Sequence, residues 1–378
     1  MNNPTNFKAP KKRIDGEALT AIFLLALSVF LVFTVGVLVF RACSNTQIQL
    51  PNQNGITTPP TQNITPPINQ SNAIFSGGIV PNKPYSTDST RTISFSTTSQ
   101  YIVLTNAQTG EIIASRSSGV KFSPASMTKV MSLIIMCERL TEEDLDKTLI
   151  FTSDMYDTVR SGGYVGSTNY GIDPNDEYKI EDLLYGIGMH SASDCVLPIV
   201  LYLAGTEEQF VEWMNEKAEA LGLSNTHFDN PIGYESEQNY TSAEDMSVIM
   251  AYAMQNKLIR STLSKEIHTS TAAGYSSTGE FVPSFSIAIY SSLFGTHEKS
   301  RISSYEKHYN KPFTLNSTKL LAGKTGYLEN DGVKNHCLVI YAKSTTTDDY
   351  YVLVVGGGTD MQYVTMKDIK NILDTYVN

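Results

Sequence analysis

Three short runs of the sequence contain the residue types that activate a serine without a histidine. They are Ser126-Met-Thr-Lys129, Ser191-Ala-Ser193 and Lys324-Thr-Gly326. A serine hydroxyl becomes a strong nucleophile when a neighbouring base takes its proton. A lysine serves as that base once burial or a second nearby cation lowers its pKa towards neutrality. The three runs together therefore predict a serine nucleophile with a lysine base.

The first run stands at the start of a predicted helix. Apolar residues recur at helical spacing over residues 126–140 and predict a buried face, formed by Met127, Val130, Met131, Ile134 and Cys137. Ser126 and Lys129 are three residues apart, so their side chains lie on one face of that helix. The N–H groups at the helix N-terminus favour an oxyanion beside Ser126. The spacing is therefore compatible with a catalytic pair.

The spacing alone does not decide between chemistry and structure. Ser118–Lys121 and Ser304–Lys307 share it, the first in a turn-like stretch and the second without an apolar helix behind it. The structural interpretation of the first run is a helix N-cap at Ser126, with Lys129 in solvent. The flanking sequence has to separate these interpretations.

The flanks of all three runs resemble those of serine-type D-alanyl-D-alanine carboxypeptidases, the low-molecular-mass penicillin-binding proteins related to serine β-lactamases. The segment Pro124–Lys129 is similar to their active-site serine segment. Their second and third motifs, S-x-N and K-T-G, have counterparts in Ser191-Ala-Ser-Asp194 and in Lys324-Thr-Gly-Tyr327, the latter directly before a predicted strand. Shorter matches follow in the same order at residues 109–111, 222–228, 230–233 and 240–246. The resemblance covers about residues 95–378.

The resemblance implies an α+β fold of the β-lactamase/transpeptidase type, in which an antiparallel sheet is covered by helices on both faces. From the hydrophobic patterns, strands are expected at residues 101–104, 111–114, 336–342 and 350–355, so that the N- and C-terminal strands meet in one sheet. Helices are expected at residues 180–189, 194–203, 207–221, 242–255 and 361–376. Residues 256–315 have weak periodicity and are expected to form a loop-rich insertion.

The resemblance also implies catalytic roles. Ser126 would attack the carbonyl carbon of a terminal D-Ala-D-Ala peptide bond and become acylated. Lys129 would take its proton, and Ser191 would help to protonate the leaving amine. The backbone N–H groups of Ser126 and Tyr327 would form the oxyanion hole. No metal or other cofactor is implied, and the six histidines show no metal-ligand spacing.

Substrate-binding roles are implied for residues of the third and second runs. Lys324 and Thr325 would hold the terminal carboxylate of the substrate, and Gly326 would keep its strand bare so that a peptide lies against it. Ser193, also expected to contact substrate, stands where the family has Asn. A carboxamide donates and accepts, whereas serine has one short, rotatable donor. Losing a charge-linked hydrogen bond costs about 1.5–3 kcal/mol. Ser167-Thr-Asn169 also fits S-x-N, but it lies upstream of the expected helix and has different flanks.

Charge and cysteine content limit the partners and the compartment. The chain has 378 residues and a net charge of −10, and no long basic run offsets the acidity. Because nucleic-acid binding depends on clustered cations, we expect no nucleic-acid partner. The four cysteines form no CxxC pair, and Cys137 and Cys337 lie within apolar runs where we expect them to be buried.

The N-terminal region predicts export with a membrane anchor. Residues 18–40 carry no charge and are long enough to span the hydrocarbon core of a bilayer. Four basic residues lie between positions 8 and 13 and only Arg41 follows closely, which places residues 1–17 in the cytoplasm. A cleaved signal peptide is the alternative, although its apolar stretch is normally shorter and ends at small residues. Residues 41–86 are rich in Pro, Thr, Asn and Gln and predict a disordered linker before a catalytic domain at residues 87–378.

The leading hypothesis is a single-pass serine D-Ala-D-Ala carboxypeptidase of the cell membrane, held in the lipid bilayer by residues 18–40. Its partners would be peptidoglycan stem peptides ending in D-Ala-D-Ala, with β-lactams as covalent inhibitors. Two alternatives stay open. A β-lactamase would use the same residues, but no E-x-x-L-N run stands between the second and third motifs. A weakened or inactive protein that binds or regulates the cell wall on the same scaffold would explain Ser193. Transfer of the acyl group to water or to an amine is left undecided.

Overall fold

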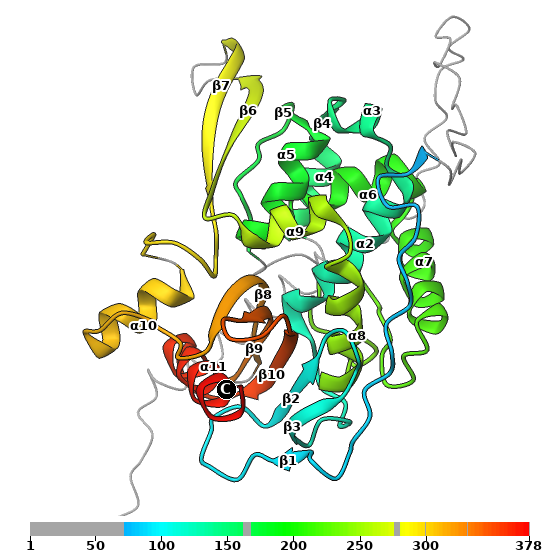
Figure 1. Ribbon diagram of the computed structural model, residues 1–378. Coiled ribbons are helices and arrows are strands. Elements are labelled where there is room, and N and C mark those ends of the chain that lie inside the picture. Colours follow the sequence, from blue (N-terminus) through cyan, green and yellow to red (C-terminus); the bar gives the residue numbers. More distant parts are fainter. Residues whose placement is uncertain (1–71, 162–167, 276–279, 299, 331, 378) are drawn as a thin grey trace, which may run out of the picture. The chain divides into compact units, whose positions relative to one another are not determined.

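The computed structural model describes residues 72–377 except residues 162–167, 276–279, 299 and 331 (Figure 1). Within these residues one sheet has six strands. Their order is β1 (Arg91–Thr92), β3 (Ile112–Arg116), β2 (Tyr101–Asn106), β10 (Tyr350–Gly358), β9 (Val333–Ser344) and β8 (Thr318–Asn330). The N-terminal strand β2 pairs with the C-terminal strand β10, as predicted. The pairs are antiparallel, as the resemblance implied, except that of the two-residue strand β1 with β3, which is parallel.

Helices lie between β3 and β8 and again after β10 (Figure 1). Their bounds are η2 (Ala125–Thr128), α2 (Lys129–Arg139), α3 (Glu142–Leu145), α4 (Ser153–Ser161), α5 (Ile180–Tyr185), η3 (Gly186–His190), α6 (Val196–Ala204), α7 (Glu207–Ala220), α8 (Ala243–Ala253), α9 (Lys257–Ser264), α10 (Arg301–Tyr309) and α11 (Gln362–Tyr376). The five helices expected after the first motif are confirmed to within a few residues. The first of them continues as the π-helical turn η3, which ends just before Ser191.

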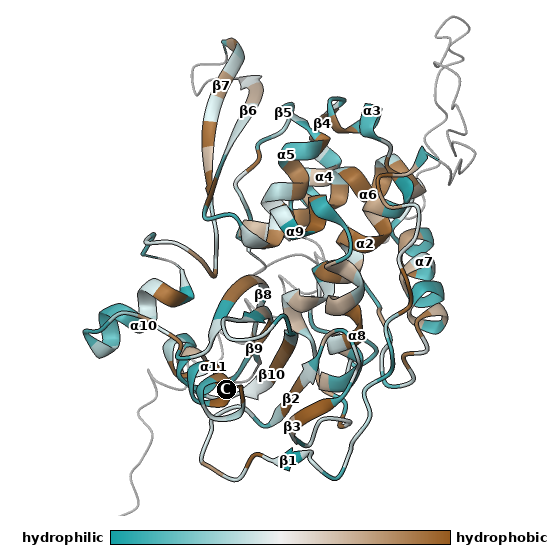
Figure 2. Ribbon diagram, viewed as in Figure 1, coloured by the Kyte–Doolittle hydropathy of each residue, from teal (hydrophilic) through white to brown (hydrophobic). Residues whose placement is uncertain are grey.

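The two faces of the six-stranded sheet carry separate hydrophobic clusters. On β2, Val103 belongs to the cluster that contains α2 and α8, whereas Ile102 and Leu104 belong to the cluster that contains α11. Successive side chains of a strand point to opposite faces, so both faces of β2 are covered. Figure 2 shows the apolar colour along β2 and α2. Cys137 and Cys337 are buried in the first cluster, as predicted.

A smaller sheet changes the interpretation of residues 256–315. Its strands, in order, are β4 (Thr148–Ile150), β5 (Glu177–Lys179), β6 (Ile267–Tyr275) and β7 (Phe281–Tyr290). Together with α9 and α10, the hairpin of β6 and β7 fills most of the segment expected to be loop-rich, so that expectation is wrong. The reason is limited burial: in β7 only Ile289 is buried and the residues that alternate with exposed ones are partly buried, so the hairpin lacks the strongly apolar face that marks a core strand in a sequence.

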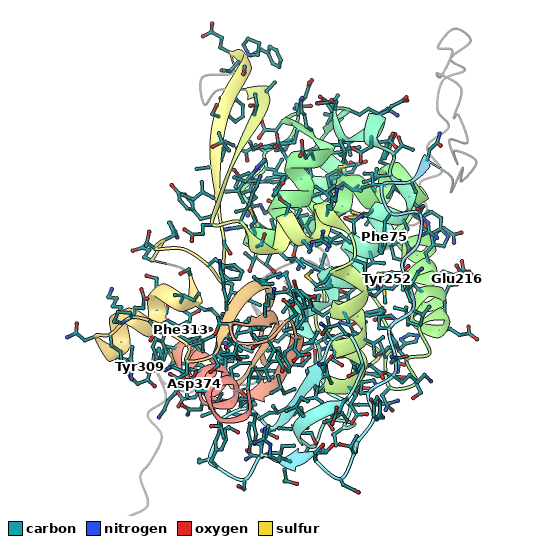
Figure 3. All side chains as sticks on the ribbon, in the orientation of Figure 1. Phe75, Glu216, Tyr252, Tyr309, Phe313 and Asp374 are labelled. Carbon is teal, nitrogen blue, oxygen red and sulfur yellow. The ribbon has the colours of Figure 1, made fainter. Side chains whose placement is uncertain are left out.

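The segment 72–86, predicted as part of the disordered linker, packs on the domain. The N–H groups of Ile74 and Phe75 donate to the carbonyls of Leu140 and Cys137, at the end of α2. The Phe75 ring is 7% exposed, and its centroid lies 5.0 Å from that of Tyr252 (Figure 3). The linker boundary is therefore corrected to no later than residue 72. Residues 41–71 lie outside the described part of the chain.

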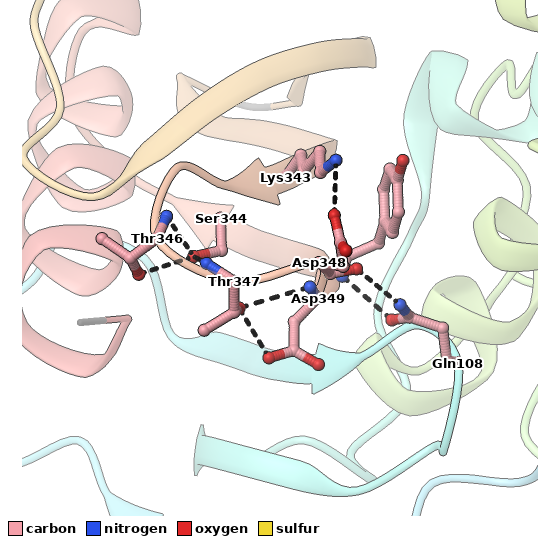
Figure 4. Close-up of polar contacts among 8 residues, drawn as sticks. Gln108, Lys343, Ser344, Thr346, Thr347, Asp348 and Asp349 are labelled. Carbon is pink, nitrogen blue, oxygen red and sulfur yellow. Dashed lines mark hydrogen bonds and ion pairs between the residues drawn. The ribbon is translucent and has the colours of Figure 1, made fainter.

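The turn between β2 and β3 is tied to the turn between β9 and β10 (Figure 4). The amide of Gln108 donates to the carbonyl of Asp348 at 3.0 Å and accepts from the N–H of Tyr350 at 2.9 Å. Lys343 pairs with Asp348 at 3.1 Å; the aspartate side chain is fully exposed and the lysine side chain is 35% exposed. These contacts join segments more than two hundred residues apart and help to fix the register of β2 against β10.

The predicted membrane span at residues 18–40 lies outside the described residues. Among the helices that are described, none combines the length and apolar character needed to cross a bilayer.

Candidate active site

The first motif places its serine and lysine in contact. Ser126 belongs to η2, and Lys129 begins α2, the helix buried at the centre of the domain. The Nζ of Lys129 lies 3.1 Å from the Oγ of Ser126. Ala125, just before the serine, has a φ of 48°, a left-handed conformation that is strained for a residue with a Cβ. The turn therefore presents Ser126 at some cost in backbone energy.

Burial adjusts the lysine for proton transfer. Lys129 is 1% exposed, and its Nζ also donates to the carbonyl of Ile232 at 2.8 Å. Desolvation lowers its pKa from 10.5 to about 7, and the carboxylate of Asp194 only partly opposes that shift. A base is most effective when its pKa lies near the working pH. Lys129 therefore has the protonation behaviour that the sequence argument required.

The second and third motifs also meet. The Nζ of Lys324 lies 2.8 Å from the Oγ of Ser191 and 2.9 Å from the carbonyl oxygen of Thr325. Burial, and after it the charges of Lys129 and Arg301, hold the pKa of Lys324 well below its usual range. Ser191 caps the π-helical turn η3 with a φ of 65°, a second left-handed residue with a side chain. The site thus contains two serine–lysine pairs, Ser126 with Lys129 and Ser191 with Lys324.

The predicted residues surround one cavity of about 360 Å³. Those that line it are Ser126, Lys129, Ser191, Thr325, Gly326 and Tyr327. The other two predicted residues are buried and do not line it. Lys324 faces Ser191 instead, and Ser193 is fully buried, with no hydrogen-bond partner for its hydroxyl among the described residues. The position of Ser193 gives no support to its predicted substrate contact. Neither Ser118 nor Ser304, the serines of the other two matching runs, lines the cavity.

Two close approaches explain glycines at the site. A side chain on Gly326 would come 2.9 Å from the carbonyl oxygen of Pro124, so the third motif lies directly against η2. Gly233 has a φ of +77°, and a Cβ there would collide with the carbonyl of Ala125. Only glycine suits both the conformation and the space at Gly233. That loop also supplies the Ile232 carbonyl to Lys129, so its fit decides where the base lies.

The sequence reasoning missed residues of the cavity that come from the segment 256–315. They are Tyr290, Ser291, Ser292, His297 and Arg301. The guanidinium of Arg301 is buried, and its Nη2 donates to the carbonyl of Gly326 at 2.8 Å. Its Nη1 has no hydrogen-bond partner in the described structure, and burial lowers its pKa to about 10. Ser292 lies 2.8 Å from the hydroxyl of Thr325. No local pattern marks these residues in the sequence.

The cavity is suited to an anion. Its lining includes Lys129 and Arg301 but no aspartate or glutamate among the described residues. A buried guanidinium is normally paired, and its planar fork fits a carboxylate. No cluster of metal-binding side chains occurs within the part of the chain that the structure covers.

Comparison with known proteins identifies the family. A family model described as D-alanyl-D-alanine carboxypeptidase matches residues 87–356. The chain belongs to the D-alanyl-D-alanine carboxypeptidase family. All three motifs and the cavity lie within the matched region.

Among curated members of this carboxypeptidase family, D-alanyl-D-alanine carboxypeptidase DacF of Bacillus subtilis is 34% identical over 162 residues, which are 43% of this chain and 40% of DacF. DacA of Escherichia coli K12 is 30% identical over 149 residues, 39% of this chain and 37% of DacA. The chain thus spans about two fifths of the length of these relatives. The crystal structure of the Streptomyces K15 DD-transpeptidase matches 74% of this chain and 97% of its own, with a TM-score of 0.59 and 20% identity. That likeness confirms the transpeptidase-like fold.

Proposed function

We propose that this family member is a serine D-Ala-D-Ala carboxypeptidase that trims peptidoglycan stem peptides through an acyl-enzyme on Ser126, and that β-lactams acylate the same serine. One observation carries the proposal. The hydroxyl of Ser126 lies 3.1 Å from Lys129, a buried lysine with a pKa of about 7, in a cavity also lined by Arg301. A nucleophile, its base and a binding group for an anion are thus combined in one place.

In the acylation step, the Oγ of Ser126 attacks the carbonyl carbon of the penultimate D-Ala, and its proton passes to the Nζ of Lys129. The carbon–nitrogen bond to the terminal D-Ala then breaks. The departing amine takes a proton from the hydroxyl of Ser191, which regains one from Lys324 at 2.8 Å. The product is an ester on Ser126 and a free D-Ala.

Deacylation reverses the roles of the same groups. Before deacylation Lys129 gives up its proton to solvent and Lys324 regains one, so that Lys129 is neutral again. A water then attacks the ester while Lys129 takes one of the water's protons, and the oxygen of Ser126 leaves with that proton. An amine in place of water would give transpeptidation from the same ester. With a β-lactam the bond that breaks belongs to the ring, so the leaving amine stays attached. The backbone N–H groups of Ser126 and Tyr327 remain our predicted oxyanion hole.

We assign the terminal carboxylate of the substrate to Thr325 and Arg301. Thr325 lines the cavity, and the free Nη1 of Arg301 provides a charge-assisted donor there. Lys324 was the cation first expected to bind the carboxylate, but its ammonium is directed to Ser191. In this proposal Lys324 acts on the proton relay and Arg301 holds the anion.

We also propose that residues 18–40 anchor the protein in the cell membrane, with the catalytic domain outside. Their length and the basic residues before them support this. Extraction of membranes with alkaline carbonate should leave the protein in the pellet, and external protease should degrade the domain in intact spheroplasts. Release of the protein by carbonate would contradict the anchor.

Labelling with a fluorescent penicillin tests the proposed chemistry. The unmodified protein should become labelled, Ser126→Ala should not, and Ser304→Ala should label normally, because that serine has the same spacing to a lysine but lies outside the cavity. Incubation with a peptide ending in D-Ala-D-Ala should release D-Ala. Absence of labelling that depends on Ser126 would refute the acyl-enzyme.

A second function is favoured by one observation, the burial of Ser193 in place of the family's asparagine. A protein weakened in this way would bind wall peptides without turning them over. Labelling by penicillin without release of D-Ala would favour this second function.

A further inference from the structure

Asn169 belongs to none of the three motifs, lines the cavity, and has the carboxamide that Ser193 lacks. Asn169 lies on the loop between α4 and β5, in the run Ser167-Thr-Asn169, and lines the cavity with Ser126, Lys129 and Ser191. Among the described residues that line this cavity it is the one carboxamide. A carboxamide donates and accepts at fixed geometry, so it is complementary to a peptide group.

The loop that carries Asn169 is held by the second motif itself. The carboxylate of Asp194 accepts from the backbone N–H groups of Tyr170 and Gly171, each at 2.8 Å, and of Ile172 at 3.2 Å. Asp194 is 1% exposed, so these bonds are sheltered from water. The residue after Asn169 is therefore fixed to the residue that follows Ser193.

The residue before Asn169 is fixed in the same way. The backbone N–H of Ser193 donates to the carbonyl of Thr168 at 2.7 Å. Asn169 is thus bracketed by hydrogen bonds to Ser193 and Asp194. A polar group positioned by such supports loses little freedom when it binds a ligand.

Ser193 itself is badly placed for a substrate contact. It is fully buried, does not line the cavity, and its hydroxyl has no partner among the described residues. Its backbone, however, positions the neighbouring loop. The position that has Asn in the family pattern therefore contributes here through its main chain.

We propose that Asn169 supplies the carboxamide of this active site and hydrogen-bonds the peptide group next to the scissile bond. It does so from the upstream loop, which Ser193 and Asp194 hold against the cavity. This inference rests on the proposed function for the identity of the ligand, a peptide ending in D-Ala-D-Ala. It places Asn169 among the substrate-binding residues.

Binding measured without catalysis tests the inference separately from the proposed function. In a Ser126→Ala background, calorimetry would give the Kd of an N-acetylated tripeptide ending in D-Ala-D-Ala. We expect Asn169→Ala to raise that Kd about five- to tenfold, the effect of one lost hydrogen bond. Asn169→Gln, which keeps the carboxamide, should recover part of the loss. Asn225→Ala, a half-buried loop asparagine outside the cavity, is the matched control and should bind as the parent does.

When the same variants are made in the protein that keeps Ser126, the rate of acylation by penicillin can also be measured. Asn169→Ala should lower the second-order rate constant of penicillin acylation by a similar factor, at an unchanged melting temperature. An unchanged Kd in Asn169→Ala overturns the inference whether or not the protein is labelled. So does a loss of binding in Ser193→Ala with none in Asn169→Ala. Failure of the unmodified protein to label, with a Kd that still depends on Asn169, would refute the acyl-enzyme and leave the assignment of Asn169 standing.

Discussion

The Nζ of Lys324 lies 2.8 Å from the Oγ of Ser191, and both side chains are buried. The contact joins residues 133 positions apart and directs the ammonium of Lys324 to Ser191, our proposed proton donor to the leaving amine. In the proposed mechanism, an ammonium in that position acts on the proton of the leaving amine and not on the substrate carboxylate. The two serine–lysine pairs would then have separate roles: Lys129 takes the proton of the nucleophile, and Lys324 supplies, through Ser191, the proton that the leaving amine takes.

The first prediction follows from that contact. Lys324→Met should lower the limiting rate constant of penicillin acylation by about 10- to 100-fold, the loss of one charge-assisted hydrogen bond, because Ser191 loses its proton donor. The half-saturating concentration should change less than threefold. Stopped-flow labelling separates the two quantities, and Lys319→Met, an exposed lysine on the same strand, is the control. A change in the half-saturating concentration alone would instead support a role of Lys324 in binding the carboxylate.

Arg301 gives the complementary prediction. Its guanidinium is buried beside Gly326 and carries a free donor, so a substrate with a terminal carboxylate should gain from it. Arg301→Met should reduce kcat/KM for a peptide ending in a free carboxylate by about 10- to 100-fold and leave the corresponding C-terminal amide nearly unaffected. Lys307→Met, on the exposed side of α10, should have no effect. Equal losses for both peptides would show that Arg301 only supports the strand.

The pH profile should report the lysine that acts as base. Lys129 has to be neutral to accept a proton, and burial lowers its pKa to about 7. Below that pH most of the lysine is protonated, so acylation should rise nearly tenfold per pH unit up to about 7 and level off above it. The acylation rate constant measured from pH 5 to 9 checks this. A flat profile across pH 7 would mean that another group is the base.

The sequence predicted the parts of the site that rest on local patterns. Ser126 and Lys129 are three residues apart at the start of a helix with a buried face, and that spacing places both side chains on one side of the helix. The pairing of β2 with β10 followed from apolar runs at both ends of the domain. The resemblance placed Ser191 and Lys324 in one site but assigned Lys324 to the substrate carboxylate, so the contact between their side chains was not predicted. No local rule joins residues so far apart.

Arg301 and Asn169 could not be predicted in this way. A single arginine in a weakly periodic segment carries no signal, and its burial depends on how α10 meets Gly326. Asn169 lies in an S-x-N run, but the flanks of that run differ from those of the family's second motif. Its place in the cavity depends on backbone hydrogen bonds from Ser193 and to Asp194, which no sequence pattern encodes.

The fit of the loop at Gly233 gives a test of how the base is positioned. Gly233→Ala combines a left-handed conformation with a collision against the Ala125 carbonyl, so we expect a loss of about 3 kcal/mol or more in the free energy of unfolding, together with loss of labelling. Gly205→Ala is the matched control, since Gly205 has a φ of +75° but nothing within 4 Å of the added Cβ. It should cost about 1 kcal/mol, from conformation alone. Urea unfolding measures both, and equal losses would mean that the contact with Ala125 relaxes freely.

The docked segment 72–86 makes the last prediction. Phe75 is 7% exposed against Tyr252, and its N–H bonds the carbonyl of Cys137 in α2, the helix that begins with Lys129. Phe75→Ala should therefore lower the free energy of unfolding by about 2–4 kcal/mol, whereas Ile79→Ala, at a side chain 83% exposed, should change it by less than about 0.5 kcal/mol. If Phe75→Ala unfolds at the same urea concentration as the parent, the segment contributes no packing energy and belongs with the linker. A loss of stability with normal labelling would instead show that the domain begins at this segment and that the active site tolerates its loosening.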